Sequence, residues 1–165
     1  MVARGAVAAL VAISASCAFV SPWAALVIGG IAGLLLPLGK YLLEVILHLD
    51  DPTAAVAIHG ISGLWGLLAL GIFADGRSGQ GWNGVGAREY LDVARQGVSG
   101  LLVGSGFQPD WPQQFYAQCV GIVALLIWAF ALSWVIFWTV NKLARGVVAF
   151  RSQMETMAEQ SSNGD

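Results

Sequence analysis

Long uncharged apolar stretches alternate with short polar links along this chain of 165 residues. Four such stretches occur, at about 5–20, 23–38, 52–74 and 115–140. A helix of roughly 20 apolar residues crosses the hydrocarbon core of a bilayer, because it satisfies its own backbone hydrogen bonds there. The pattern therefore predicts an all-α fold, a polytopic transmembrane helical bundle of four spans.

The second apolar stretch carries a turn signal and a packing signal. Only Ser21-Pro22 separates it from the first stretch, which predicts a tight turn with Trp23 at the level of the lipid headgroups. Further along, Gly29 and Gly33 have the GxxxG spacing that lets a neighbouring helix approach closely. We therefore expect a helix to pack on these glycines.

The few charges orient the predicted spans. Only 11% of the residues are charged and 57% are hydrophobic, a balance far from that of a soluble domain. With four spans, both ends share one side with five basic residues, namely Arg4, Lys40, Lys142, Arg145 and Arg151. The positive-inside rule makes that side cytoplasmic and the loop 75–114 external. We expect a domain over 1–150 in the cell membrane and a short polar cytoplasmic tail over 151–165.

Composition and motifs exclude several classes of function. The net charge is -2 and no basic face is present, so nucleic acid is not an expected partner. Cys17 and Cys119 lie in separate apolar stretches without metal-ligand spacing, so we expect reduced, inert thiols and no metal. Catalytic groupings of Ser, His and Asp and paired carboxylates are not visible, so we expect neither an enzyme nor a cofactor.

Two local patterns have a second interpretation. Arg4, an apolar run and small residues before Cys17 also fit a secretory signal with a cleavage site, but another span follows after a two-residue turn, so we prefer a helix. Residues 79–84 match GxGxxG, which binds nucleotides only between a strand and a helix. Because an apolar helix precedes them here, an external loop is predicted.

His59 is the strongest candidate for function. Residues 52–74 carry no other charged or titratable side chain, which puts His59 near the middle of the membrane. Ionisable groups at that depth rarely face lipid and commonly mark a substrate or proton path. The alternative is a histidine that hydrogen-bonds to a neighbouring helix, and position alone leaves both interpretations open.

Small residues surround His59 on its predicted helix face. At 100° per residue, four of them lie within about 60° of it. They are Ala55, Ser62, Gly63 and Gly66. Such a stripe either admits a close-packed helix or leaves a lumen for a very small solute.

Asp51-Pro52 opens the predicted helix of His59. Aspartate is a favoured N-cap and proline a favoured first helical residue, so one role of Asp51 is to accept hydrogen bonds from free backbone N–H groups. A role in conduction is the alternative.

Several motifs occur together with His59. In chain order they are residues 8–13, 17–25, 50–52, 57–66 and 71–74. Together they resemble the ammonium transporter (Amt) family, over essentially all of residues 5–145, which correspond to the last four of its eleven spans. By this resemblance, His59 falls on the second histidine of the family's twin-histidine pore, and Asp51 on the acid that opens the same span.

The resemblance implies a partial ammonium transporter fold, a homotrimer in the lipid bilayer with one pore per subunit between two inverted repeats. The function implied is passage of ammonium or ammonia. A bare cation in hydrocarbon costs tens of kcal/mol, so the ion must lose its proton or pass it on separately. Paired imidazoles offer ammonia a donor and an acceptor and relay the proton, whereas alkali ions have no proton to give.

The chain also departs from the family pattern. The first seven spans and the first pore histidine have no counterpart, so a complementary chain that carries them is an expected partner. A partial gene product, one half of a split transporter and a remnant are three open explanations. The acidic segment that usually follows Arg145 is absent, which leaves docking of the P-II regulatory protein with little support. An ammonium sensor or a non-transporting membrane scaffold is the alternative function.

Overall fold

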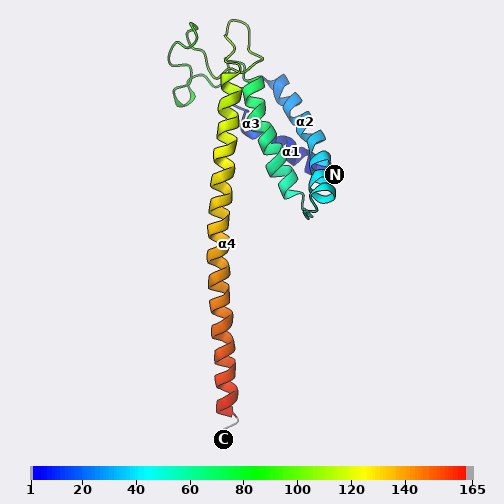
Figure 1. Ribbon diagram of the computed structural model, residues 1–165. Helices are drawn as coiled ribbons and strands as arrows, with labels where there is room; N and C mark the ends of the chain where they lie inside the picture. Colours follow the sequence, from blue (N-terminus) through cyan, green and yellow to red (C-terminus); the bar gives the residue numbers. More distant parts are fainter. Residues whose placement is uncertain (1, 163–165) are drawn as a thin grey trace. The chain divides into compact units, whose positions relative to one another are not determined.

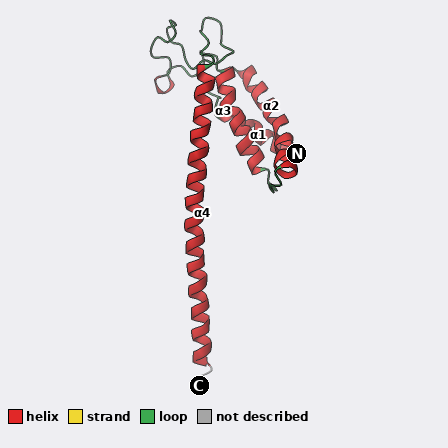
Figure 2. Cartoon of the chain, in the orientation of Figure 1, coloured by secondary structure: helices red, strands yellow, loops and turns green. Residues whose placement is uncertain are grey.

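The computed structural model describes residues 2–162, with the side chains of residue 82 and residues 146–162 set aside. Its α-helices are α1 (Val2–Ser14), α2 (Pro22–Tyr41), α3 (Ser62–Phe73) and α4 (Gln113–Ser162) (Figure 1). Two π-helical turns, η1 (Leu42–Ile46) and η2 (Val56–Ile61), and one 3-10 turn, η3 (Trp82–Gly84), complete the regular structure. Within residues 2–162 no β-sheet forms, and the all-α prediction is confirmed (Figure 2).

The chain divides into two compact units, Met1–Ile122 and Val123–Asp165. The first unit holds α1, α2, α3 and the beginning of α4, and the second holds the rest of α4. The predicted division into a domain over 1–150 and a tail over 151–165 stays a prediction. The backbone of the tail continues α4 to Ser162, and its side chains lie outside the described part.

Three helical stretches have the length and composition to cross a membrane, namely Pro22–Ile46, Val56–Phe73 and Gln113–Arg145. The helix α1 is apolar but has only 13 residues. It ends at Ser14 rather than at Val20, because the next residues form tight turns, with Phe19 N–H donating to Ser16 O at 2.9 Å. Cys17 therefore lies in an exposed turn and not in a helix, and its thiol is free, as is that of Cys119.

Alanines make up much of the contact between the helices of the first unit. α2 buries a residue at every fourth position, in the series Ala24, Ile28, Ala32 and Leu36. This series is one ridge of a helix surface, and α1 faces it with alanines. Membrane helices favour such residues at their contacts, because short side chains let the backbones come close. Against this core, the Trp65 indole N–H donates to Ile28 O at 3.0 Å.

The glycines of α2 differ in how closely another helix approaches them. A β-carbon on Gly29 would lie 3.3 Å from Ala9 Cβ, so α1 does pack closely there. At Gly30 and Gly33 a β-carbon would meet nothing within 4 Å in the described structure. The expected packing on the GxxxG pair is therefore seen at its first glycine and not at Gly33.

The closest approach of α1 and α3 occurs at Gly66. A β-carbon there would overlap the Ala12 carbonyl oxygen and lie 2.9 Å from Ala12 Cα. Both obstacles are backbone atoms, which cannot rotate away as a side chain can. Glycine at this position therefore sets the distance between the two helices.

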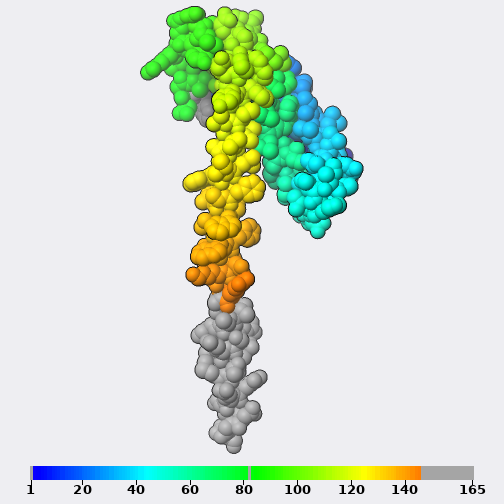
Figure 3. All heavy atoms as spheres, in the orientation of Figure 1, coloured from blue at the N-terminus to red at the C-terminus, as the bar shows by residue number. Residues whose placement is uncertain are grey.

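The loop between α3 and α4, residues 74–112, is held together by hydrogen bonds. Asp75 Oδ1 accepts from the backbone N–H groups of Arg77 and Ser78 at 2.9 and 2.7 Å. The side-chain amide of buried Gln96 makes two hydrogen bonds with the backbone of Gln108. It accepts from the Gln108 N–H at 2.9 Å and donates to the Gln108 carbonyl at 3.0 Å. In Figure 3 this loop, green to yellow-green, forms a continuous mass of atoms.

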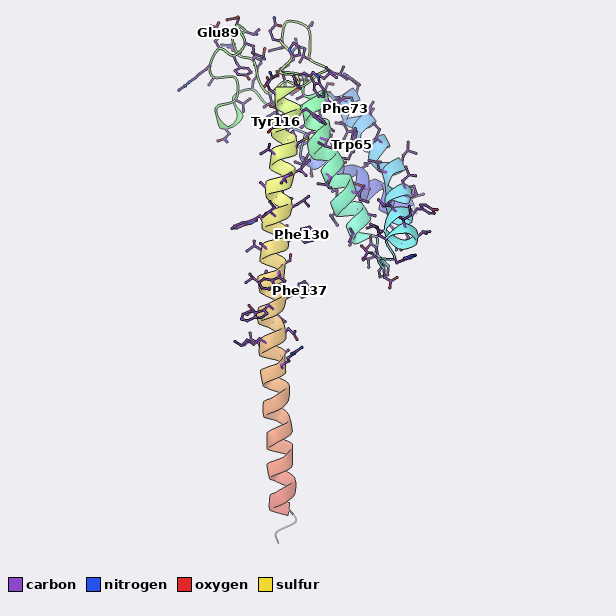
Figure 4. All side chains as sticks on the ribbon, in the orientation of Figure 1. Trp65, Phe73, Glu89, Tyr116, Phe130 and Phe137 are labelled. Carbon is purple, nitrogen blue, oxygen red and sulfur yellow. The ribbon has the colours of Figure 1, made fainter. Side chains whose placement is uncertain are left out.

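Residues 123–140 of the second unit form an apolar helix without a charged side chain. From Val123 to Arg145 every described side chain is exposed, and Phe130 and Phe137 project outward (Figure 4). Near the end of this segment the Lys142 ammonium lies 5.1 Å from the centre of the Trp138 ring. A helix that is apolar all round and ends in Trp and Lys is typical of a membrane span with its interfacial anchors.

Candidate functional site

His59 lies in the π-helical turn η2, directly before α3. Its side chain is exposed, and within the described residues it makes no hydrogen bond, ion pair or ring contact. Among the described side chains, none supports the alternative interpretation, in which His59 hydrogen-bonds to a neighbouring helix. A neutral imidazole offers one nitrogen as a donor and the other as an acceptor.

The small residues around His59 divide between two environments. Ser62 is fully buried and donates to Ala57 O at 3.4 Å, while Gly63 and Gly66 face Val11 and Ala12 of α1. Ala55 is exposed, as His59 is.

The π turn explains why the expected common face divides. Its hydrogen bonds run from residue i+5 to residue i, as from Ser62 N–H to Ala57 O. The turn is wider than an α-helical turn, so each residue advances by less than the 100° that the expected face assumed. A lining role for Ala55, Ser62 and Gly63 stays a prediction, since nothing in residues 2–162 tests it.

Asp51 satisfies a free backbone donor at the start of this helix. The residue is 5% exposed, and its Oδ2 accepts from Ala57 N–H at 3.0 Å. The acid therefore has the expected backbone role, although the donor lies six positions away rather than two or three. In a buried site, a carboxylate with a backbone N–H partner fixes the local course of the chain, because losing the bond leaves an unpaired charge.

The helix starts later than Pro52 because a tight turn precedes it. Ala54 N–H donates to Asp51 O at 3.0 Å, which closes a four-residue turn with Pro52 at its favoured second position. Ala54 has a φ of 59°, which is unfavourable for a residue with a β-carbon. From the neighbouring helix, the Arg4 guanidinium donates to Pro52 O at 3.5 Å. This turn lets the Asp51 carboxylate accept from Ala57 N–H, and the Arg4–Pro52 hydrogen bond connects the turn to α1.

The α3–α4 loop contains a groove that the sequence motifs did not reveal. Its volume is about 670 Å³. Its polar side chains come from three loop segments and from the first turn of α4: Arg88, Glu89, Tyr90, Gln96, Ser99, Asp110 and Gln114. Glu89 lies on this loop in Figure 4. The motif at residues 79–84 lies in the same loop and not between a strand and a helix. The composition of this segment predicts a polar loop. It does not predict the groove, because residues such as Tyr90 and Asp110 come together only when the backbone folds.

One contact in this groove alters an acid–base property. The Tyr90 hydroxyl donates to Asp110 Oδ2 at 3.1 Å. That hydrogen bond, together with partial burial and the negative charge of Asp110, raises the pKa of Tyr90 above its ordinary value. The tyrosine therefore stays a neutral donor throughout the physiological pH range. Among the side chains that the structure describes, no three of His, Cys, Asp or Glu gather as metal ligands would.

Comparison with known proteins gives one family. The sequence profile of the Ammonium Transporter Family matches residues 1–160. Ammonium transporter Amt2 of Archaeoglobus fulgidus is 42% identical over 144 residues, 87% of this chain and 27% of that protein. Ammonium transporter 3 of Dictyostelium discoideum is 34% identical over 138 residues, 84% of this chain and 28% of that protein. Putative ammonium transporter 1 member 5 of Arabidopsis thaliana is 33% identical over 142 residues, 86% of this chain and 26% of that protein.

The resemblance carried by the motifs around His59 is thus confirmed at the level of the whole chain. The chain spans about a quarter of the length of these relatives. Its long apolar helices fit the multi-pass membrane architecture that the sequence pattern predicts. Because the profile matches nearly all of its residues, this chain belongs to the ammonium transporter family.

Proposed function

We propose that this chain supplies the His59 side of a pore for ammonium or ammonia. Further spans of the family fold supply the rest of the pore wall, and the function is transport rather than catalysis. The observation that carries the proposal is the placement of His59, an exposed imidazole within an apolar helix, without a partner among the described side chains. The relatives that match the chain are named ammonium transporters, which supports the choice of substrate.

The chemistry of an imidazole suits this task. Ammonium cannot cross hydrocarbon as a bare ion, because the desolvation cost is tens of kcal/mol. A neutral ring accepts a hydrogen bond at one nitrogen and donates one at the other, so it can hold ammonia and pass a proton without becoming permanently charged. The Asp51–Ala57 hydrogen bond helps by holding the first turn of the helix that carries the ring.

The arrangement in the membrane is part of the same proposal. The chain matches 27% of the Archaeoglobus relative, so a pore needs additional spans, from a complementary chain or from a longer protein. The assembly proposed is a homotrimer in the cell membrane, with the α3–α4 loop outside and both termini in the cytoplasm. The basic residues Arg4 and Lys40 support this orientation through the positive-inside rule.

Reconstitution into liposomes tests the transport function. The full chain is incorporated alone, and together with the remainder of the Archaeoglobus relative expressed as a separate chain. We expect ammonium-driven pH change only when both are present, because one chain leaves the pore wall open. The remainder alone is the control. If the two chains co-purify as a complex and still give no flux above the control, the transport proposal is wrong.

Cysteine labelling on intact cells tests the orientation. Ser105→Cys is suitable because Ser105 is exposed on the α3–α4 loop, and Cys17 and Cys119 are replaced by serine in the background. A membrane-impermeant maleimide is expected to label residue 105 on intact cells. Asn141→Cys, near the other end of the apolar part of α4, is expected to react only after permeabilisation. The reverse pattern would overturn the orientation.

A further inference from the structure

A small cavity lies between the start of α1 and the end of α2. Its volume is about 170 Å³. The lining residues are Arg4, Gly5, Gly33, Leu36, Pro37, Lys40 and Ala54. In Figure 1 the N-terminus lies beside the cyan end of α2, where this cavity is found. Two of the chain's eight basic residues thus contribute to one cavity in an otherwise weakly charged protein.

Both cations at the cavity have hydrogen-bond donors to spare. The Arg4 guanidinium has five N–H groups, and one of them reaches Pro52 O at 3.5 Å. The Lys40 ammonium has three, and it pairs with Glu44 at 2.7 Å. The pair leaves Lys40 partly neutralised, while Arg4 has no acidic partner in the described structure. The cavity lining therefore carries two cations and no acidic side chain, with several free donors, which suits a phosphate group.

The remaining walls of the cavity are apolar and open. Gly5 of α1 and Gly33 of α2 have nothing within 4 Å of a β-carbon position, so the helices do not close on each other there. Leu36 is 9% exposed and forms part of the wall. Along the same part of α2, Leu34 and Leu38 are 70% and 63% exposed. An apolar surface thus leads away from the two cations.

We propose that this cavity binds an anionic phospholipid, with the phosphate on Arg4 and Lys40 and an acyl chain along the surface past Gly33. Basic cavities between membrane helices bind anionic headgroups, because the charges interact near the low-dielectric membrane surface. A volume of about 170 Å³ holds roughly six water molecules at about 30 Å³ each, which suits part of a headgroup and not a helix of another chain. The inference does not rest on His59 or on the proposed pore.

Native mass spectrometry of the purified full chain in a neutral detergent tests the proposal. Phosphatidylglycerol and phosphatidylcholine with identical acyl chains are titrated in parallel. We expect phosphatidylglycerol to bind more tightly. The Arg4→Gln and Lys40→Gln variants are each expected to weaken its binding about fivefold, and the double variant about thirtyfold, with phosphatidylcholine unaffected. The control is Arg88→Gln, a basic residue on the α3–α4 loop outside this cavity.

Two further variants separate the contributions of charge and of the apolar wall. Arg4→Lys keeps the charge and is expected to restore most of the binding, whereas Gly33→Leu fills the apolar wall and is expected to weaken it with both cations intact. Helix content by circular dichroism is checked for each variant, and if the double variant unfolds, the Arg4→Lys and Gly33→Leu pair decides.

Several outcomes would overturn the inference. Equal binding of the two lipids, or wild-type binding by the folded double variant, excludes an anionic lipid at this site. Full displacement by inorganic phosphate would show a site for a free anion. A changed ratio of oligomers in the same spectra, with the lipid count constant, would show that a second copy of the chain covers the cavity.

Discussion

In a pore completed by the family's other spans, His59→Ala is expected to lose proton-coupled ammonium flux by roughly 10²- to 10⁴-fold, the factor that a positioned proton-transfer group commonly contributes. The reason is that alanine leaves an apolar wall with neither donor nor acceptor in place of the imidazole. The measurement is ammonium and potassium flux in liposomes that contain both chains.

Ala55→Gly is the matched control, because Ala55 lies one turn before His59 and is equally exposed. It removes one methyl group and no polar atom, so a mild effect is expected. Assembly of each variant is checked by size-exclusion chromatography. If His59→Ala assembles normally with its flux and selectivity unchanged, the histidine has a packing role only.

His59→Glu is the sharper variant of the same experiment. A carboxylate can still accept and release a proton, but it lacks the imidazole's fixed donor beside its acceptor. It also carries a negative charge when ionised, which attracts alkali ions. Discrimination between ammonium and potassium is therefore expected to fall before total conduction does.

Gly66→Ala is expected to have the largest effect on stability. The added β-carbon meets the Ala12 backbone, so α1 and α3 must separate at their closest contact. Overpacking of this kind costs about 1–3 kcal/mol, and it exceeds the roughly 1 kcal/mol that alanine adds to helix propensity. We expect a net loss of about 1–2 kcal/mol, measured by denaturation with sodium dodecyl sulfate in mixed micelles.

Gly30→Ala is the control with the opposite expected sign. Gly30 lies inside α2, and its β-carbon would meet nothing within 4 Å. The same substitution there brings the gain in helix propensity without a clash, so about 0.5–1 kcal/mol of added stability is expected. If both variants change stability by the same amount, the Ala12–Gly66 contact does not limit the packing of α1 on α3.

The helices were predictable from the sequence because membrane burial demands continuous apolar runs. α2 begins at Pro22 and α4 at Gln113, within two residues of the expected starts. The end of α1 was not predictable, since the turns after Ser14 depend on local hydrogen bonds that apolar residues accommodate as readily as a helix. The absence of a close helix at Gly33 in the described structure was not predictable either. The GxxxG spacing shows that a close contact is allowed, but not which helix makes it.

The residues of the candidate site could be proposed from the sequence, but their geometry could not. His59 and Asp51 are recognisable because titratable groups are rare in apolar stretches. Their spacing along the chain gave no sign of the π turn. It forms where the buried Asp51 carboxylate binds Ala57 N–H and the packing of Ala57 and Ile58 holds the backbone in place. These are tertiary contacts, and they cannot be predicted from a hydrophobic pattern with a period of 3.6 residues.

The π turn at η2 also bears on how this helix tolerates changes in length. A π turn holds one residue more than an α-helical turn between the same two ends. A deletion of one residue between Ala55 and Ile58 can therefore be absorbed by converting η2 into α-helix, with Gly66 still facing Ala12. The same deletion after Ser62 rotates every later residue of α3 by about 100° and breaks that contact. Length variation among homologous chains should thus be concentrated before His59 rather than after it.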